Sequence, residues 1–254
     1  MDSTFFPKII AHRGANRLAP QNTMPAFETA VNMGVDGFET DVHLTSDGEI
    51  VLCHNYTIDE TSDGSGRIED MTLAELKEHD FGSYFSPDFA GTRIPTLAEF
   101  LEFCADRRDK INIINIEIKP PLDKETGIAA ATVEAVKRFG LFDELLISSF
   151  DHQVLLDCKA CDPACRTGYL YPTTQPIRGQ SPVPTLAAVK RTGCDAVHPI
   201  SMLVNRAYIE RMHKNGLAVN VWTVNDGKAI MDLTEWGADG IISDMPDKVN
   251  LYKR

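Results

Sequence analysis

Ile9-Ile10-Ala11-His12-Arg13-Gly14 decides between the two folds that the rest of the chain allows. An apolar run that stops abruptly at two cation-capable residues is typical of a buried parallel strand. In a doubly wound open sheet, the first strand normally leads into a glycine-rich nucleotide loop. Gly14 is followed by no such loop, so the segment favours a closed barrel.

Outward from this strand, apolar runs alternate with helical patterns along the whole chain. The pattern predicts strands at residues 9–12, 37–44, 111–118, 145–150, 167–171, 196–200, 218–224 and 240–243. It predicts helices at residues 23–33, 97–107, 128–139, 153–160, 185–191, 205–215, 227–236 and 246–251. A chain of 254 residues has the usual size of one (β/α)₈ TIM barrel. We therefore expect a single α/β domain over residues 1–254.

The spacing is irregular only after the second predicted strand. About fifty residues separate this strand from its helix, where two to six are usual. Residues 45–49 have a tight-turn sequence and precede the apolar run 50–53, which predicts a hairpin-like return. We expect an insertion at about residues 46–95 that caps the barrel mouth, where TIM barrels carry their catalytic residues. Four aromatic residues of this segment are expected to form its own small core: Phe81, Tyr84, Phe85 and Phe89.

Composition and charge argue against several classes of partner. The net charge of −12 is the wrong sign for a protein that binds nucleic acid or anionic membranes. No segment reaches the roughly 20 apolar residues of a spanning helix, and residues 1–7 lack the basic start and apolar core of a signal peptide. We therefore expect a cytoplasmic protein without stable membrane association.

Acidic side chains gather at the ends of two predicted strands. The two-residue period of a strand places Glu39, Asp41 and His43 on one face, and it places Glu117 beside Lys119. Neighbouring carboxylates are costly in a low-dielectric site unless a cation or a proton compensates them. One divalent cation held by Glu39, Asp41 and Glu117 is the simplest compensation. The competing interpretation for each acid alone is a helix cap or an ion pair.

Two histidines belong to the same region of the predicted barrel. His12 ends the first strand next to Arg13, and His54 follows the predicted hairpin. Each histidine alone could be a structural residue. However, the selected acidic and basic side chains all lie at the first three strand ends or in the loop above them, so one pocket can hold them together. The remaining histidines are expected to be structural or exposed: His43, His79, His152, His198 and His213.

The order of these motifs resembles the glycerophosphodiester phosphodiesterase family. The resemblance rests on residues 12–14, 20–23, 39–42, 54, 94–97, 116–119, 148–150, 221–225 and 240–246. It implies that Glu39, Asp41 and Glu117 ligate Mg²⁺ or Ca²⁺. It further implies an acid/base pair of His12 and His54, phosphate binding by Arg13 and Lys119, a glycerol side lined by Phe150 and Trp222, and outer support from Gln21 and Asn22.

The implied reaction converts a small glycerophosphodiester, such as glycerophosphocholine or glycerophosphoethanolamine, to glycerol 3-phosphate and an alcohol. The residue types leave open which histidine is the acid, whether water or a glycerol hydroxyl attacks, and the oligomeric state. Three residues depart from the family pattern: Gln21 replaces Glu, Asn55 replaces Asp, and Glu60 replaces Arg. The alternatives are a weakly active barrel that binds glycerophosphodiesters and a lysophospholipase D-like enzyme.

Overall fold

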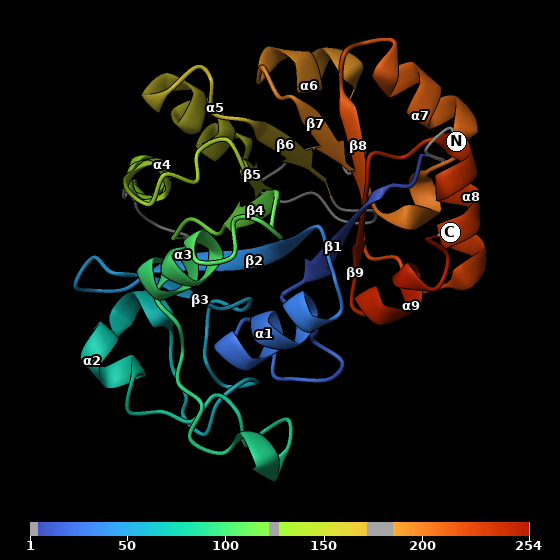
Figure 1. Cartoon of the computed structure of the whole chain (residues 1–254). Helices are drawn as coiled ribbons and strands as arrows, with labels where there is room; N and C mark the ends of the chain where they lie inside the picture. The colour runs from blue at the N-terminus through green and yellow to red at the C-terminus, as the bar shows by residue number, and fades with distance from the viewer. Residues whose placement is uncertain (1–4, 122–126, 172–184, 254) are drawn as a thin grey trace.

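Eight parallel strands close into a barrel in the computed structural model, which describes residues 5–121, 127–171 and 185–253 (Figure 1). Its strands are β1 (Lys8–His12), β2 (Gly37–Leu44), β4 (Ile113–Ile118), β5 (Leu145–Ser149), β6 (Thr167–Leu170), β7 (Ala196–His198), β8 (Ala218–Val221) and β9 (Gly240–Ser243). Each strand pairs with its neighbours, and β1 pairs with both β9 and β2, which closes the sheet. The predicted (β/α)₈ TIM barrel is confirmed.

Helices surround the barrel on its outside (Figure 1). They are α1 (Met24–Asn32), α3 (Leu97–Ala105), α4 (Ile128–Arg138), α5 (His152–Cys161), α6 (Leu186–Arg191), α7 (Arg206–His213), α8 (Gly227–Trp236) and α9 (Pro246–Asn250). Several begin at a residue whose side chain accepts a hydrogen bond from a backbone N–H of the first turn, as Thr96, Asp151 and Asp226 do. The predicted helix starts agree with the observed ones to about one residue, also where the capping residue makes no such bond, as at Thr23 and Gly127.

The predicted strand ends are less accurate than the helix starts. The strand predicted at residues 218–224 ends at Val221 as a continuous ladder, and beyond it Trp222 keeps an isolated parallel bridge to Ile200. There Trp222 N–H donates to the carbonyl of Pro199, and Trp222 Nε1 donates to the carbonyl of His198 at 2.7 Å. Apolar character alone does not reveal where a strand stops pairing.

The insertion begins with a strand that returns along β2. β3 (Ile50–Leu52) runs antiparallel to β2, with Val42 opposite Leu52, which confirms the hairpin-like return. Short helices follow: η1 (Ile68–Asp70), α2 (Leu73–Leu76) and η2 (Pro87–Phe89). A separate apolar cluster packs beneath them: Val51, Cys53, Ile58, Ile68, Leu76, Phe81 and Ile94.

The expectation that all four aromatics of residues 81–89 form this small core is wrong. Phe81 is buried in it, but Tyr84 and Phe85 are 40% and 37% exposed. The cause is a turn organised by Asp80, whose Oδ1 accepts from the backbone N–H groups of Gly82 and Ser83 at 2.7 and 3.0 Å. This turn directs the following side chains away from the cluster.

No helix within the described residues combines the length and the apolar character needed to cross a membrane. Of the N-terminal segment at residues 1–7, residues 1–4 lie outside the described part of the chain.

Candidate active site

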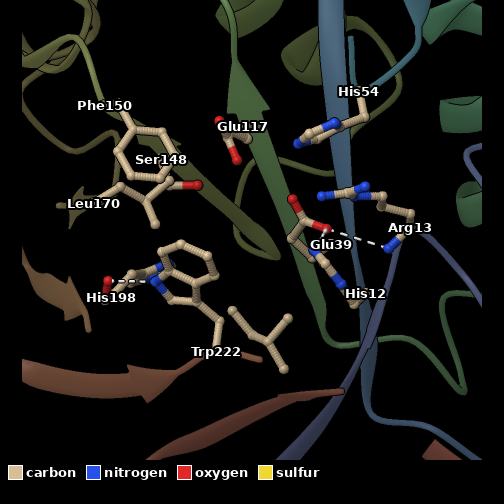
Figure 2. A pocket seen from close by; sticks show the side chains of 11 residues that line it. His12, Arg13, Glu39, His54, Glu117, Ser148, Phe150, Leu170, His198 and Trp222 are labelled. Atoms are coloured by element: carbon tan, nitrogen blue, oxygen red, sulfur yellow. Dashed lines mark hydrogen bonds and ion pairs between the residues drawn. The ribbon is translucent and has the colours of Figure 1, made fainter. Parts of the chain in front are cut away.

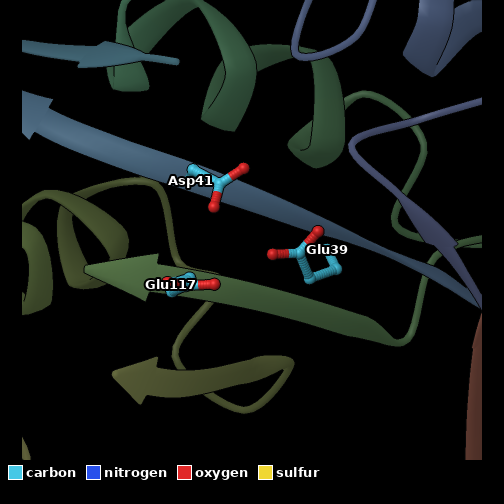
Figure 3. Close-up of side chains that lie close together, drawn as sticks. All are labelled: Glu39, Asp41 and Glu117. Atoms are coloured by element: carbon cyan, nitrogen blue, oxygen red, sulfur yellow. The ribbon is translucent and has the colours of Figure 1, made fainter. Parts of the chain in front are cut away.

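Three buried carboxylates meet on two neighbouring barrel strands (Figure 3). Glu39 and Asp41 project from β2, and Glu117 projects from β4, where it lies directly opposite Asp41 in the strand register. One carboxylate oxygen of each lies within 4.8 Å of the others, and the three side chains are buried. Oxygen ligands at this spacing suit a hard divalent cation such as Mg²⁺ or Ca²⁺.

The charges of this cluster are not balanced. Burial, followed by the charges of Asp41 and Glu117, raises the pKa of Glu39 well above its ordinary value. Burial also raises the pKa of Glu117, against the opposing effect of Lys119. Burial alone would raise the pKa of Asp41 too, but Lys119 and Arg13 hold it below its ordinary range. Three carboxylates thus share two permanent cations, so the cluster needs a further cation or a proton.

The two cations are bound differently. Lys119 Nζ lies 3.0 Å from Asp41 Oδ1 and also donates to Glu117 Oε1. Lys119 is only 8% exposed, and it lies behind the carboxylates without lining the cavity. The Arg13 side chain lines the cavity, with its Nε 3.4 Å from Asp41 Oδ2 and its backbone N–H donating to Glu39 Oε2 at 3.2 Å.

Gln21 and Asn22 support this arrangement from the loop between β1 and α1. Gln21 Oε1 accepts from Arg13 Nη1 at 2.7 Å, where a Glu would form an ion pair. Asn22 Nδ2 donates to Asp41 Oδ2 at 2.9 Å, and Asn22 Oδ1 accepts from Thr40 Oγ1 at 2.8 Å. Asn22 has a φ of 55°, a left-handed conformation that asparagine tolerates better than most residues.

His12 is held by a carboxylate on its far side. Its Nδ1 lies 2.6 Å from Asp244 Oδ1, which also accepts from Asn16 Nδ2 at 2.7 Å. Asp244 Oδ2 accepts from Asn225 Nδ2 at 2.8 Å. A carboxylate only accepts, so it places the proton of a neutral His12 on Nδ1 and leaves Nε2 as the free nitrogen. Nε2 lies 3.8 Å from Glu39 Oε2. Burial lowers the pKa of His12, which favours its neutral form.

His54 is held by an amide instead. Its Nδ1 lies 2.6 Å from Asn55 Oδ1, and Asn55 Nδ2 donates to Glu60 Oε2 at 2.8 Å. The Glu60 carboxylate only accepts, so it fixes the amide with its oxygen toward His54. Burial lowers the pKa of His54 to about 4, so the ring is neutral, with its proton on Nδ1 and its free Nε2 available. Two departures from the family pattern therefore contact each other.

One cavity of ≈ 150 Å³ connects these groups to an apolar end (Figure 2). His12, Arg13, Glu39, His54 and Glu117 line one side. The other side is lined by Ser148, Phe150, Leu170, His198, Trp222 and Ile242. The rings of Phe150 and Trp222 meet edge to face, with their centroids 5.8 Å apart. The cavity therefore offers charged groups on one side and mostly apolar side chains on the other.

The structure brings all eleven selected residues to this mouth of the barrel, together with two residues that were not selected. Asp244 follows β9 directly, and His198 ends β7. The strand-end criterion that selected His12 and Glu117 would have found Asp244, and it applies also to His198, which was expected to be structural or exposed and which lines the cavity. His198 is fully buried with its Nδ1 unpaired among the described residues, and burial lowers its pKa to about 3.

Comparisons with known proteins agree in the family they indicate. The model of the glycerophosphoryl diester phosphodiesterase family matches residues 12–248. A glycerophosphodiester phosphodiesterase of Caldanaerobacter subterraneus subsp. tengcongensis is 36% identical over 247 residues, which cover 97% of this chain and 98% of that protein. One of Bacillus altitudinis is 32% identical over 251 residues, covering 95% and 96% of the two chains. An Oleispira antarctica phosphodiesterase, solved in complex with the product sn-glycerol-3-phosphate, superposes with a TM-score of 0.85 at 31% identity, covering 97% of this chain and 96% of that chain.

Proposed function

The chain belongs to the glycerophosphoryl diester phosphodiesterase family, and we propose on this premise that it hydrolyses small glycerophosphodiesters to glycerol 3-phosphate and an alcohol. The observation that carries the proposal is the cavity in which His12, His54, Arg13 and two of the three clustered carboxylates face one another. A phosphodiester gains negative charge on its nonbridging oxygens in the transition state, so its hydrolysis needs concentrated positive charge and two proton transfers.

A divalent cation fits the observed donors. The residues that would hold it are Glu39, Asp41 and Glu117, whose carboxylate oxygens lie close together. Their three negative charges outnumber the two positive charges of the neighbouring Lys119 and Arg13. Mg²⁺ or Ca²⁺ held there would neutralise charge on the phosphate oxygens and polarise the phosphorus centre. Lys119 pairs with Asp41 and Glu117 and favours their ionised forms, against the effect of burial. Arg13 binds a phosphate oxygen from the cavity wall with its guanidinium.

The two histidines transfer the protons. Each presents a free Nε2 because its Nδ1 proton is engaged, by Asp244 for His12 and by Asn55 for His54. One imidazole removes a proton from the attacking oxygen, and the other protonates the leaving alcohol. Each transfer contributes about 10²–10⁴-fold to the rate. Phe150 and Trp222 cover the apolar face of the glycerol.

The contact between Glu60 and Asn55 is expected to control the proton position on His54. Glu60→Lys presents only donors to the amide, so Asn55 turns its nitrogen toward His54 and the free nitrogen of the ring moves to Nδ1. We expect kcat to fall about 10-fold, as for other outer partners of active-site histidines. Adding Asn55→Asp restores a group that accepts from both sides, so the double variant should recover most of the loss in steady-state assays.

The matched control for this swap is Glu60→Gln, whose amide can still accept from Asn55 and should change kcat less. A Glu60→Lys variant with unchanged kcat, or a double variant no faster than the single one, would show that the Asn55 amide does not set the state of His54.

The proposed substrate class is tested by comparing a soluble diester with its acylated analogue. We expect choline release from glycerophosphocholine to exceed that from lysophosphatidylcholine by at least about 10-fold in kcat/KM, because the cavity of ≈ 150 Å³ is too small for an acyl chain. Matched concentrations, the same cation and mixed micelles are needed. A preference for the acylated substrate would support the lysophospholipase D-like alternative, and no product from either would support a binding barrel.

A further inference from the structure

A second cavity, of ≈ 310 Å³, lies on the outer side of His12 and Arg13. Its remaining lining comes from the loop after β1, from the insertion and from the end of β9: Asn16, Arg17, Gln21, Tyr84, Phe85 and Asp244. The inner cavity and this outer cavity therefore share His12 and Arg13 and extend from them. A phosphodiester likewise carries two esterified alcohol groups on one phosphate, here called the glycerol limb and the alcohol limb.

We propose that this outer cavity receives the alcohol limb of the substrate and favours an alcohol that carries an anionic group such as a carboxylate. The inference rests on the proposed function, and it adds the chemistry of the alcohol. The inner cavity has about half the volume of the outer one, which suits the constant glycerol limb. Three residues of the outer cavity are exposed, Arg17, Tyr84 and Phe85, so it can accept a limb of variable size.

The walls of the outer cavity are fixed in place. Tyr84 Oη accepts from the backbone N–H of Gln21 at 3.2 Å, which ties the insertion to the loop after β1. The rings of Tyr84 and Phe85 stand edge to face, with their centroids 6.5 Å apart. These rings, which do not belong to the insertion core, therefore offer an apolar wall for the carbon skeleton of an alcohol.

The charge of the cavity selects the head group. Arg13 and Arg17 both line it, but the Arg13 guanidinium already contacts Asp41 and Gln21, which leaves Arg17 to bind the head group. The anionic carboxylate of Asp244 has both oxygens engaged by His12, Asn16 and Asn225. The exposed Arg17 side chain makes no hydrogen bond or ion pair with any residue in the described parts of the chain. A guanidinium without a partner binds a carboxylate by charge-assisted hydrogen bonds.

A cationic head group is the competing occupant, since aromatic rings can hold a quaternary ammonium. Arg17 beside the two rings makes a poor site for it, because like charges repel inside a partly enclosed cavity and the oxygens of Asp244 already accept from its own neighbours. We therefore expect the outer cavity to bind a serine head group better than a choline head group, although both diesters place the same glycerol group in the inner cavity.

Glycerophosphoserine and glycerophosphoethanolamine form a matched pair, because they differ by a single carboxylate. We expect the wild-type protein to favour the serine diester by about 10-fold in kcat/KM, the effect of a charge-assisted hydrogen bond. Arg17→Ala should remove most of this preference, and Arg17→Glu should invert it. Added salt should weaken the wild-type preference.

Arg138→Ala is the matched control, because Arg138 is exposed at the C-terminal end of α4, at the barrel face opposite the site, and should leave the ratio unchanged. An unchanged ratio in Arg17→Ala, or a wild-type preference for glycerophosphocholine, would overturn the proposal. Calorimetric binding of the same pair gives the ratio without turnover. Absence of hydrolysis would thus refute the proposed function, while the binding ratio would still decide the identity of the alcohol site.

Discussion

Removal of divalent cations with a chelator is expected to abolish turnover of glycerophosphodiesters, and added Mg²⁺ or Ca²⁺ is expected to restore it. Without a cation, Glu39, Asp41 and Glu117 present three carboxylates to an anionic substrate, and burial keeps water from screening their charge. The measurement is the rate of glycerol 3-phosphate formation across a titration of each cation. The loss should approach the detection limit, since charge neutralisation is the main catalytic task.

Two conservative variants locate the cation. Asp41→Asn and Glu117→Gln remove one charge each and should shift the titration to at least about 10-fold higher cation concentration. Glu210→Gln makes the same chemical change at an exposed position on α7 and should leave the titration unchanged. Full turnover in excess chelator would contradict the metal role, and an unchanged titration in both variants would contradict the assignment of these ligands.

Much of this site was predictable because strands have a simple period. Alternation along residues 37–44 places Glu39 and Asp41 on one face, and the same rule applies to Glu117. Strand order in a barrel follows chain order, so β2 and β4 had to be neighbours once the insertion was recognised. The register that sets Asp41 opposite Glu117 follows from pairing in space and was not readable from either strand alone.

The outer cavity was not predictable for a physical reason. Aromatic residues in a long insertion have two stable environments, a local core or a wall against the main domain, and composition does not distinguish them. The side-chain hydrogen bonds of Asp80 and the contact between Tyr84 and Gln21 decide the outcome here. The Asp80 bonds are local, but the contact between Gln21 and Tyr84 joins residues 63 positions apart, so local patterns contain no signal for the wall it forms.

His12→Ala and His54→Ala are each expected to lower kcat by at least about 10²-fold, because each removes one of the two proton transfers. The double variant should lose far less than the product of the two effects, since a reaction already deprived of one transfer gains little from the other. His43→Ala is the control, because His43 is buried beside them on β2 and does not line the cavity. A larger loss of kcat in His43→Ala than in His54→Ala would mean that His43, and not His54, transfers the second proton.

The contribution of Asp244 is separable from that of His12 by a double-variant cycle. Asp244→Asn keeps the shape of the side chain but removes the charge that holds the Nδ1 proton of His12, and an amide can donate to that nitrogen instead. We expect kcat to fall about 10–100-fold in wild-type protein and to change little in the His12→Ala background, because the orienting effect requires the imidazole. Equal losses in both backgrounds would instead indicate that Asp244 supports the barrel mouth through Asn16 and Asn225 and does not act on His12.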